Sequence, residues 1–161
     1  MNEARPYRKG VGGVLFNREG KAFAGRRIDT PGQAWQFPQG GMDEGESPRH
    51  AVLRELAEET GTAKAEIIAE SAAWFSYDLP KGLRDKVWKG RYRGQEQLWF
   101  ALRFLGDDGD IDLDAGGDPE FSHWKWARLE DMPRQIVSFK RRMYERIVAE
   151  FRHLARPERE T

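Results

Sequence analysis

Three glutamates in the first half of the chain recur at helical spacing. Glu55, Glu58 and Glu59 stand at i, i+3 and i+4, so a helix would carry their side chains on one face. Like charges at this spacing destabilise a helix by about 0.2–0.5 kcal/mol per pair. A hard divalent cation such as Mg²⁺, which binds carboxylate oxygens, would reverse that effect. The spacing alone leaves two interpretations open: a metal site, or an ordinary solvated acidic face.

The residues around the glutamates indicate where such a helix begins and ends. Ser47 is a typical N-cap, and Pro48 is a typical first helical residue. Gly61 supplies a C-terminal stop. These signals predict a helix over Pro48–Thr60.

The segment before this helix ends in a loop with an acidic residue. Gly40 and Gly41 close an extended segment, and Glu46 lies just before the N-cap, where the helix dipole favours a negative charge. Arg54 stands two turns along the helix and could pair with Glu46. We expect this pair to tie the loop to the helix.

Other segments of the chain supply the elements that must position this helix. Short β-branched and aromatic runs, several of them bounded by turn signals, predict strands near residues 11–16, 21–26, 35–37, 67–69, 74–77, 98–105 and 124–127. Apolar residues at helical spacing predict a second, amphipathic helix over 138–154. Strands mixed with two well-separated helices predict an α/β fold in which a mixed β-sheet lies between helices on both faces.

Composition excludes several kinds of chemistry. The 161-residue chain has no cysteine, which removes disulfides, thiolate metal sites and cysteine nucleophiles. Its 27 basic and 27 acidic residues cancel, so no global field steers it toward nucleic acid or membrane. Its apolar runs are far shorter than a membrane span, and the N-terminus lacks a signal-peptide pattern. We expect a cytoplasmic protein without membrane contact, formed by one domain over residues 1–161, with a core over about 5–154 and a charged tail at 156–161.

Seven residues between positions 40 and 61 also follow a known pattern. The fixed positions are Gly40, Glu46, Arg54, Glu55, Glu58, Glu59 and Gly61. Their spacing resembles the Nudix box, the signature of hydrolases that act on nucleoside diphosphates linked to another group. At roughly one residue in 15 per position, the match would arise by chance with a probability of about 10⁻⁸ per start position. Thr62 departs from the aliphatic residue that usually closes the box.

The resemblance implies roles for each matching residue. Glu55, Glu58 and Glu59 would hold more than one Mg²⁺ ion, for which Mn²⁺ or another divalent metal could substitute. Gly40 would offer its backbone carbonyl to a metal, and Glu46 and Arg54 would complete the catalytic set by bracing the loop. Metals held in this way neutralise a polyphosphate and lower the pKa of a bound water that attacks phosphorus. The general base stays open between Glu59 and Glu120.

Segments outside the box are similar to one subfamily, the RNA pyrophosphohydrolases and dinucleoside tetraphosphate hydrolases. They are Tyr7-Arg8, Trp35 to Gly41, Gly94 to Phe100, Pro119 to Phe121 and Val137 to Lys140. Carried over, Glu120 would be a fourth metal carboxylate, and Arg8, Arg27 and Lys140 would contact phosphate. Phe139 would stack on a base, although its place in an amphipathic segment suits a core residue equally well.

The resemblance predicts a hydrolase whose partner is the 5′-polyphosphorylated end of a nucleotide. Two substrates remain open: 5′-triphosphorylated RNA, which we favour, and diadenosine tetraphosphate. The alternative is a nucleotide-binding regulatory module with weak catalysis, but no box carboxylate is missing. We assume a monomer. An aspartate run over 107–114 has the opening spacing of a calcium loop but lacks its glycine and closing glutamate, so we interpret it as an acidic surface loop.

Overall fold

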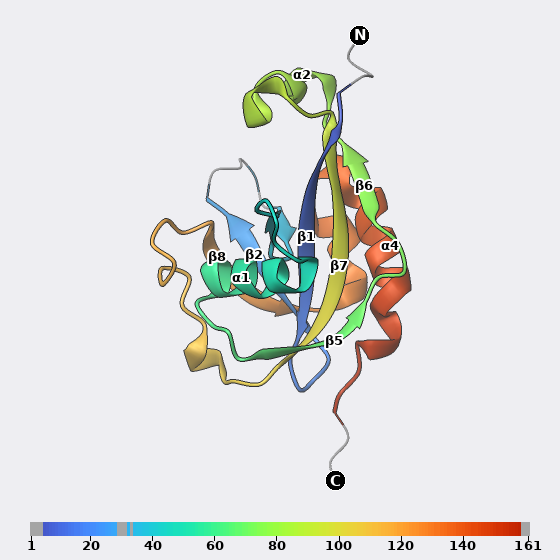
Figure 1. Cartoon of the computed structure of the whole chain (residues 1–161). Coiled ribbons are helices and arrows are strands. Elements are labelled where there is room, and N and C mark those ends of the chain that lie inside the picture. Colours follow the sequence, from blue (N-terminus) through green and yellow to red (C-terminus); the bar gives the residue numbers. More distant parts are fainter. Residues whose placement is uncertain (1–4, 29–31, 33, 159–161) are drawn as a thin grey trace.

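A computed structural model of the chain describes residues 5–28, 32 and 34–158. Its centre is an eight-stranded sheet with helices packed against it (Figure 1). The strands are β1 (Tyr7–Phe16), β2 (Ala22–Arg27), β3 (Trp35–Gln36), β4 (Gln39–Gly41), β5 (Ala65–Glu70), β6 (Phe75–Asp78), β7 (Gly94–Phe104) and β8 (Phe121–Ala127). The helices of four or more residues are α1 (Pro48–Thr60), α2 (Lys81–Arg84), η2 (Val87–Gly90), α3 (Met132–Gln135) and α4 (Arg141–Phe151).

The sheet is mixed, as predicted. The strand order along its main path is β3-β2-β1-β7-β5, and β4, β6 and β8 pair with β1, β7 and β2. The two central strands, β1 and β7, run parallel, whereas the other pairs are antiparallel. Predicted strands coincide with seven of these elements, and β4 is the one that sequence reasoning did not separate.

Both faces of the sheet are covered. Alternate residues of a strand point to opposite faces, and β1 follows this rule: Leu15 belongs to a core that includes Leu56 of α1, whereas Val14 and Phe16 belong to a core that includes Ile147 of α4. Figure 1 shows α1 in front of the central strands and α4 beyond β6. The predicted α/β/α sandwich is confirmed.

The helix that carries the glutamates has the predicted bounds, Pro48–Thr60. The Ser47 hydroxyl accepts a hydrogen bond from the His50 amide at 3.2 Å, and Gly61 ends the helix in the left-handed conformation with φ 80°. Val52 and Leu56 are buried and hold this helix against the sheet. Its opposite face is therefore left for the charged residues.

The predicted amphipathic helix near 138–154 is confirmed at its centre, α4, whereas the turns at its two ends are not α-helical. A 3-10 turn (Ser138–Lys140) precedes α4, and another (Arg152–Leu154) follows it. Such tighter turns are common at helix ends. Phe139 and Lys140 lie in the first of these turns, directly before α4.

The tail is exposed but attached. Residues 156–158 are exposed, and the Glu158 amide donates a hydrogen bond to the Arg18 carbonyl at 2.8 Å. Residues 159–161 of the predicted tail lie outside the described residues. Among the helices of the described segments, none is both long enough and apolar enough to cross a membrane.

Candidate active site

A cavity of about 320 Å³ opens beside α1. Its lining comes from four strands, from the helices α1 and η2, from the 3-10 turn Ser138–Lys140 and from the segment before β8. The lining residues are Arg8, Arg27, Gln39, Gly40, Gly41, Glu55, Glu58, Tyr77, Trp88, Glu120 and Lys140. Seven of these are residues that the sequence singled out, and the fold brings them to one place from positions as far apart as 8 and 140.

Arg54 fixes the loop before α1, as predicted. Its Nε and one terminal nitrogen donate to the two carboxylate oxygens of Glu46 at 2.7 and 2.8 Å. The second of these nitrogens also donates to the Gly41 carbonyl at 3.0 Å. The Arg54 guanidinium, together with the Asp43 amide, holds the pKa of the Glu46 carboxyl far below its usual range. Glu46 therefore stays ionised well into the acidic range, and its charge-assisted hydrogen bonds with Arg54 anchor the loop.

Arg54 also contacts two of the box carboxylates. Its other terminal nitrogen donates to Glu55 at 2.9 Å and to Glu58 at 3.3 Å. Within residues 5–28, 32 and 34–158, no group of three or more acidic, histidine or cysteine side chains is arranged to hold a metal ion. The structure thus brings four of the five predicted ligands, Gly40, Glu55, Glu58 and Glu120, to the lining of one cavity without assembling them around a common point. The fifth, Glu59, is buried and does not line the cavity. A cation bound there would compete with Arg54 for oxygens of Glu55 and Glu58.

Glu59 is the most buried of the box carboxylates, with 3% of its surface exposed. One of its oxygens accepts a hydrogen bond from the Gln39 amide at 2.9 Å. Burial, and then the negative charges of Glu55 and Glu120, raise its pKa well above the usual range. Burial also raises the pKa of Glu55. Glu59 and Glu55 therefore carry an electrostatic cost when both are ionised.

This donor set fits a hard divalent cation. Every side chain in it offers carboxylate oxygens, which Mg²⁺ prefers, and the mutual repulsion at Glu59 is what a positive ion would relieve. Gly40 lines the same cavity. A Cβ at Gly40 would lie 2.1 Å from the Glu55 carboxyl carbon, so only glycine allows that carboxylate to approach the backbone of β4.

Glu120 reaches the cavity from the segment that precedes β8. It directly precedes β8, and its carbonyl accepts a hydrogen bond from the Ile28 amide at 3.0 Å, just after β2. Its charge acts on the pKa of both Glu55 and Glu59. The pairing of β8 with β2 places this exposed carboxylate opposite α1. No local sequence pattern predicts that Glu120 belongs to the site; only the resemblance to the subfamily indicated it.

A second cavity of about 400 Å³ adjoins the first and is mostly apolar. It is lined by Arg27, Ala34, Gln36, Tyr77, Leu79, Leu83, Val87, Trp88, Ile136, Val137, Phe139 and Lys140. Four of these residues line both cavities. The half-buried Phe139 ring lies 5.8 Å from the Tyr77 ring. Phe139 therefore packs partly against the core and also lines the cavity, so the core interpretation holds in part and base stacking stays a prediction.

Lys140 stands between the two cavities with 7% of its surface exposed. Its Nζ lies over the Tyr77 ring, 5.1 Å from the centroid. Burial, and then the positive charge of Arg27, lower its pKa to about 8. A phosphate at this position would compensate both effects.

Sequence reasoning did not assign Trp88 or Gln39 to the site. Gln39 directly precedes Gly40, and this position next to the box could have indicated it. In the structure its backbone amide donates a hydrogen bond to Glu59. Trp88 lies in a segment without periodicity, so its place could not be derived. The apolar residues Leu79, Leu83 and Val87 of the second cavity were missed for the same reason.

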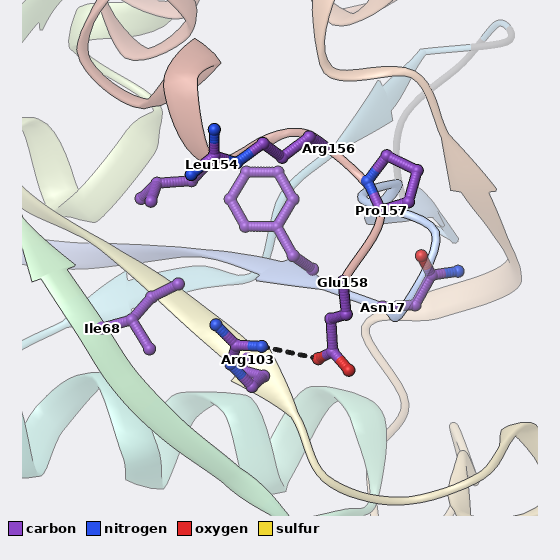
Figure 2. Close-up of a pocket in the computed structure, with 8 residues that line it drawn as sticks. Asn17, Ile68, Arg103, Leu154, Arg156, Pro157 and Glu158 are labelled. Carbon is purple, nitrogen blue, oxygen red and sulfur yellow. Dashed lines mark hydrogen bonds and ion pairs between the residues drawn. The ribbon is translucent and has the colours of Figure 1, made fainter. Parts of the chain in front are cut away.

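A third cavity, of about 240 Å³, lies elsewhere on the molecule and shares no lining residue with these two (Figure 2). It is formed where the segment 156–158 crosses β1 and β7, and an ion pair of 2.7 Å joins Arg103 to Glu158 at its edge. It contains a single carboxylate, which Arg103 neutralises. The carboxylate cavity is therefore the candidate active site.

Comparison with known proteins agrees with this geometry. A family model described as "NUDIX domain" matches residues 6–147. The chain belongs to the Nudix family, whose members typically depend on a divalent metal.

Two relatives are similar over nearly the whole chain. A protein of Cereibacter sphaeroides called "RNA pyrophosphohydrolase" is 55% identical over 154 residues, which cover 93% of this chain and 94% of the relative. One of the same name from Novosphingobium aromaticivorans is 54% identical over 160 residues, covering 96% and 99%. Among solved structures, the MutT protein from Methanosarcina mazei Go1 has a TM-score of 0.66 at 21% identity, covering 91% of this chain and 96% of that one. This last likeness concerns the fold alone.

Proposed function

We propose that this Nudix protein is an RNA pyrophosphohydrolase, which removes pyrophosphate from the 5′-triphosphorylated end of RNA. The observation that carries the proposal is the junction of two cavities, one rich in carboxylates and cations and the other apolar. A triphosphate with its first nucleoside has the same division into a charged and a largely apolar part. Relatives called "RNA pyrophosphohydrolase" at 48–55% identity support this choice of substrate.

The metal site in this proposal consists of Glu55, Glu58, Glu59 and Glu120, with the Gly40 carbonyl as a further ligand. Mg²⁺ ions bound there, or Mn²⁺ in their place, would neutralise the polyphosphate and lower the pKa of a water molecule. Water attacks phosphorus, a P–O–P bond breaks, and the products are pyrophosphate and a 5′-monophosphorylated RNA.

The remaining residues of the site bind and orient the substrate. Arg8, Arg27 and Lys140 donate to phosphate oxygens and stabilise the charge that develops during transfer. Phe139 and Tyr77 contact the base in the apolar cavity, where stacking tolerates any base. Arg54 and Glu46 hold the loop and α1 in a fixed relation. Contact with only the end of the RNA agrees with the zero net charge of the chain, since binding along an RNA backbone needs many basic contacts. We also propose a cytoplasmic location for the protein.

Release of pyrophosphate from a 5′-triphosphorylated RNA oligonucleotide in the presence of Mg²⁺ tests the proposal. We expect Glu58→Gln to lower the turnover number by at least about tenfold, because it removes a charged ligand that metal-bound substrate requires. Glu145→Gln is the matched control, since Glu145 is an exposed glutamate on α4. Its turnover is expected to equal that of the wild type.

Two outcomes would contradict the proposal. If Glu58→Gln kept its turnover within tenfold, the site assignment would be wrong. If the wild type bound nucleotides tightly and released no phosphate with Mg²⁺ or Mn²⁺, the regulatory module would replace the enzyme. Diadenosine tetraphosphate, measured side by side with the RNA, decides which substrate is preferred.

A further inference from the structure

The segment between β6 and β7 forms an arm that projects beyond the end of the sheet. It comprises residues 79–93 and includes α2 and η2; Figure 1 shows it above the ends of both strands. Its base is closed by a hydrogen bond of 2.8 Å from the Leu79 amide to the Arg93 carbonyl. The arm therefore leaves and re-enters the sheet at one point.

Side chains fasten the arm at its base and along its length. Asp78 accepts a hydrogen bond from the Tyr7 hydroxyl and pairs with Arg93 at 2.9 Å. Asp85 in the arm pairs with Arg5, which precedes β1, at 2.7 Å. These contacts attach the arm to β1 and β6, because the arm itself contains few buried apolar side chains.

The backbone of the arm is strained at its end. Trp88 and Lys89 are consecutive residues in the left-handed conformation, with φ values of 50° and 58°. Among the described residues no other non-glycine residue has a positive φ. Such residues are uncommon, and strain of this kind concentrates at ligand-binding sites. One of the two strained residues in this arm is Trp88 itself, so its backbone conformation sets the direction of the Trp88 side chain.

The Trp88 ring lies where the two cavities meet. It lines the carboxylate cavity and the apolar cavity. The guanidinium carbon of Arg8 lies 5.1 Å from the centre of the ring, within cation–π range. Arg8 passes so close to β4 that a Cβ at Gly41 would lie 2.1 Å from one of its nitrogens. Arg8 is thus confined between Trp88 and the Gly41 backbone.

We infer that Trp88 is a substrate-binding residue, which contacts the first nucleoside of the substrate at its junction with the polyphosphate and positions Arg8 for phosphate binding. This inference rests on the proposed function for the identity of the substrate. A molecule that fills both cavities must pass Trp88, because this ring borders both. Trp88 would then act on two parts of one ligand. It holds Arg8, which binds the phosphates, and its own ring contacts the nucleoside.

Steady-state kinetics on a short 5′-triphosphorylated RNA test this role. We expect Trp88→Ala to raise KM by about fivefold or more, the lower end of the loss from a removed base-stacking ring. The turnover number is expected to fall by no more than about threefold, because the carboxylates are untouched and the Gly41 backbone still confines Arg8 on one side. Trp88→Phe keeps an aromatic face, and we expect it to restore KM to within about threefold of the wild type.

Trp74→Ala is the matched control. Trp74 is likewise half-buried and holds a cation, Lys9, 5.1 Å from its ring centre, but it lines neither cavity. Its KM is expected to stay within about twofold of the wild type. Equal KM values for Trp88→Ala and Trp74→Ala would overturn the inference, as would failure of Trp88→Phe to restore KM while thermal melting shows a native fold.

Binding of guanosine triphosphate, measured by titration calorimetry with Ca²⁺, separates this inference from the proposed function. If the wild type releases no pyrophosphate from RNA but binds the nucleotide, and Trp88→Ala weakens binding at least about fivefold, the inference holds and the proposed function fails. If Trp88→Ala binds as tightly as the wild type, the inference fails, whatever the activity. A wild type that neither cleaves RNA nor binds the nucleotide would overturn both.

Discussion

Lys140 is a cation almost completely removed from water, with Glu59 near enough to act on it electrostatically. Burial, and then the Arg27 charge, lower its pKa from 10.5 to about 8. Below that pH the lysine is charged in both the folded and the unfolded chain. Between about 8 and 10.5 the unfolded chain binds the proton and the folded chain does not, so this group makes stability rise with pH in that window.

The same shift predicts the pH dependence of activity. We expect kcat/KM on triphosphorylated RNA to fall as the pH passes about 8, because a neutral Lys140 loses its attraction for phosphate. This ratio reports the pKa of the free enzyme. In Lys140→Met the ratio is expected to be lower at pH 7 and to lack the inflection near 8. An inflection that survives in Lys140→Met would assign it to another group.

At the scale of elements, the strain in η2 gives a prediction about stability. Lys89 is exposed and left-handed, a conformation that costs an L-residue ~1–2 kcal/mol. Glycine removes that strain and adds ~0.5–1 kcal/mol of chain entropy to the unfolded state. We therefore expect Lys89→Gly to raise the free energy of unfolding by about 0.5–1 kcal/mol in urea titrations.

Lys86→Gly is the control for this prediction. Lys86 is also exposed, but its backbone is right-handed, with φ −95°. Without strain to relieve, glycine there is expected to lower the free energy of unfolding by ~0.5–1 kcal/mol. If glycine lowered the free energy of unfolding at both positions, the left-handed conformation of Lys89 would carry no strain that glycine relieves.

How far the elements could be predicted depended on local signals. The bounds of α1 followed from Ser47, Pro48 and Gly61, because capping is a property of adjacent residues. The arm could not be predicted, since contacts with Arg5 and Asp78 from outside it hold its structure. The amphipathic helix near 138–154 followed from its apolar spacing, but that spacing does not show that its first and last turns are 3-10 turns.

At the scale of the molecule, the site required the whole sheet. The box residues lie on one helix and could be found from their spacing, but Glu120 reaches them only because β8 pairs with β2. The contacts of Arg54 with Glu55 and Glu58 were not foreseen either, since spacing does not say which of several neighbours a guanidinium selects. The residue roles remain our proposals, whereas their common location is a feature of the fold.

This assembly predicts that metal binding stabilises the entire chain. The unfolded chain does not hold carboxylates from α1 and from the segment before β8 together, so Mg²⁺ binds the folded state. At a concentration of about one hundred times Kd, binding adds ~2.7 kcal/mol. For a chain of this size that corresponds to a rise in Tm of about 5–10 °C. Thermal melting of EDTA-treated protein, with and without Mg²⁺ at constant ionic strength, measures it.

Two variants decide whether that rise comes from the candidate site. In Glu58→Gln we expect the shift in Tm to fall to less than half, because one ligand is lost. Asp114→Asn removes an equal charge from the exposed aspartate loop, and its shift is expected to match that of the wild type. If both variants kept the full shift, the ion would bind elsewhere. If Asp114→Asn alone lost it, the aspartate run that we interpret as an acidic surface loop would be the metal site.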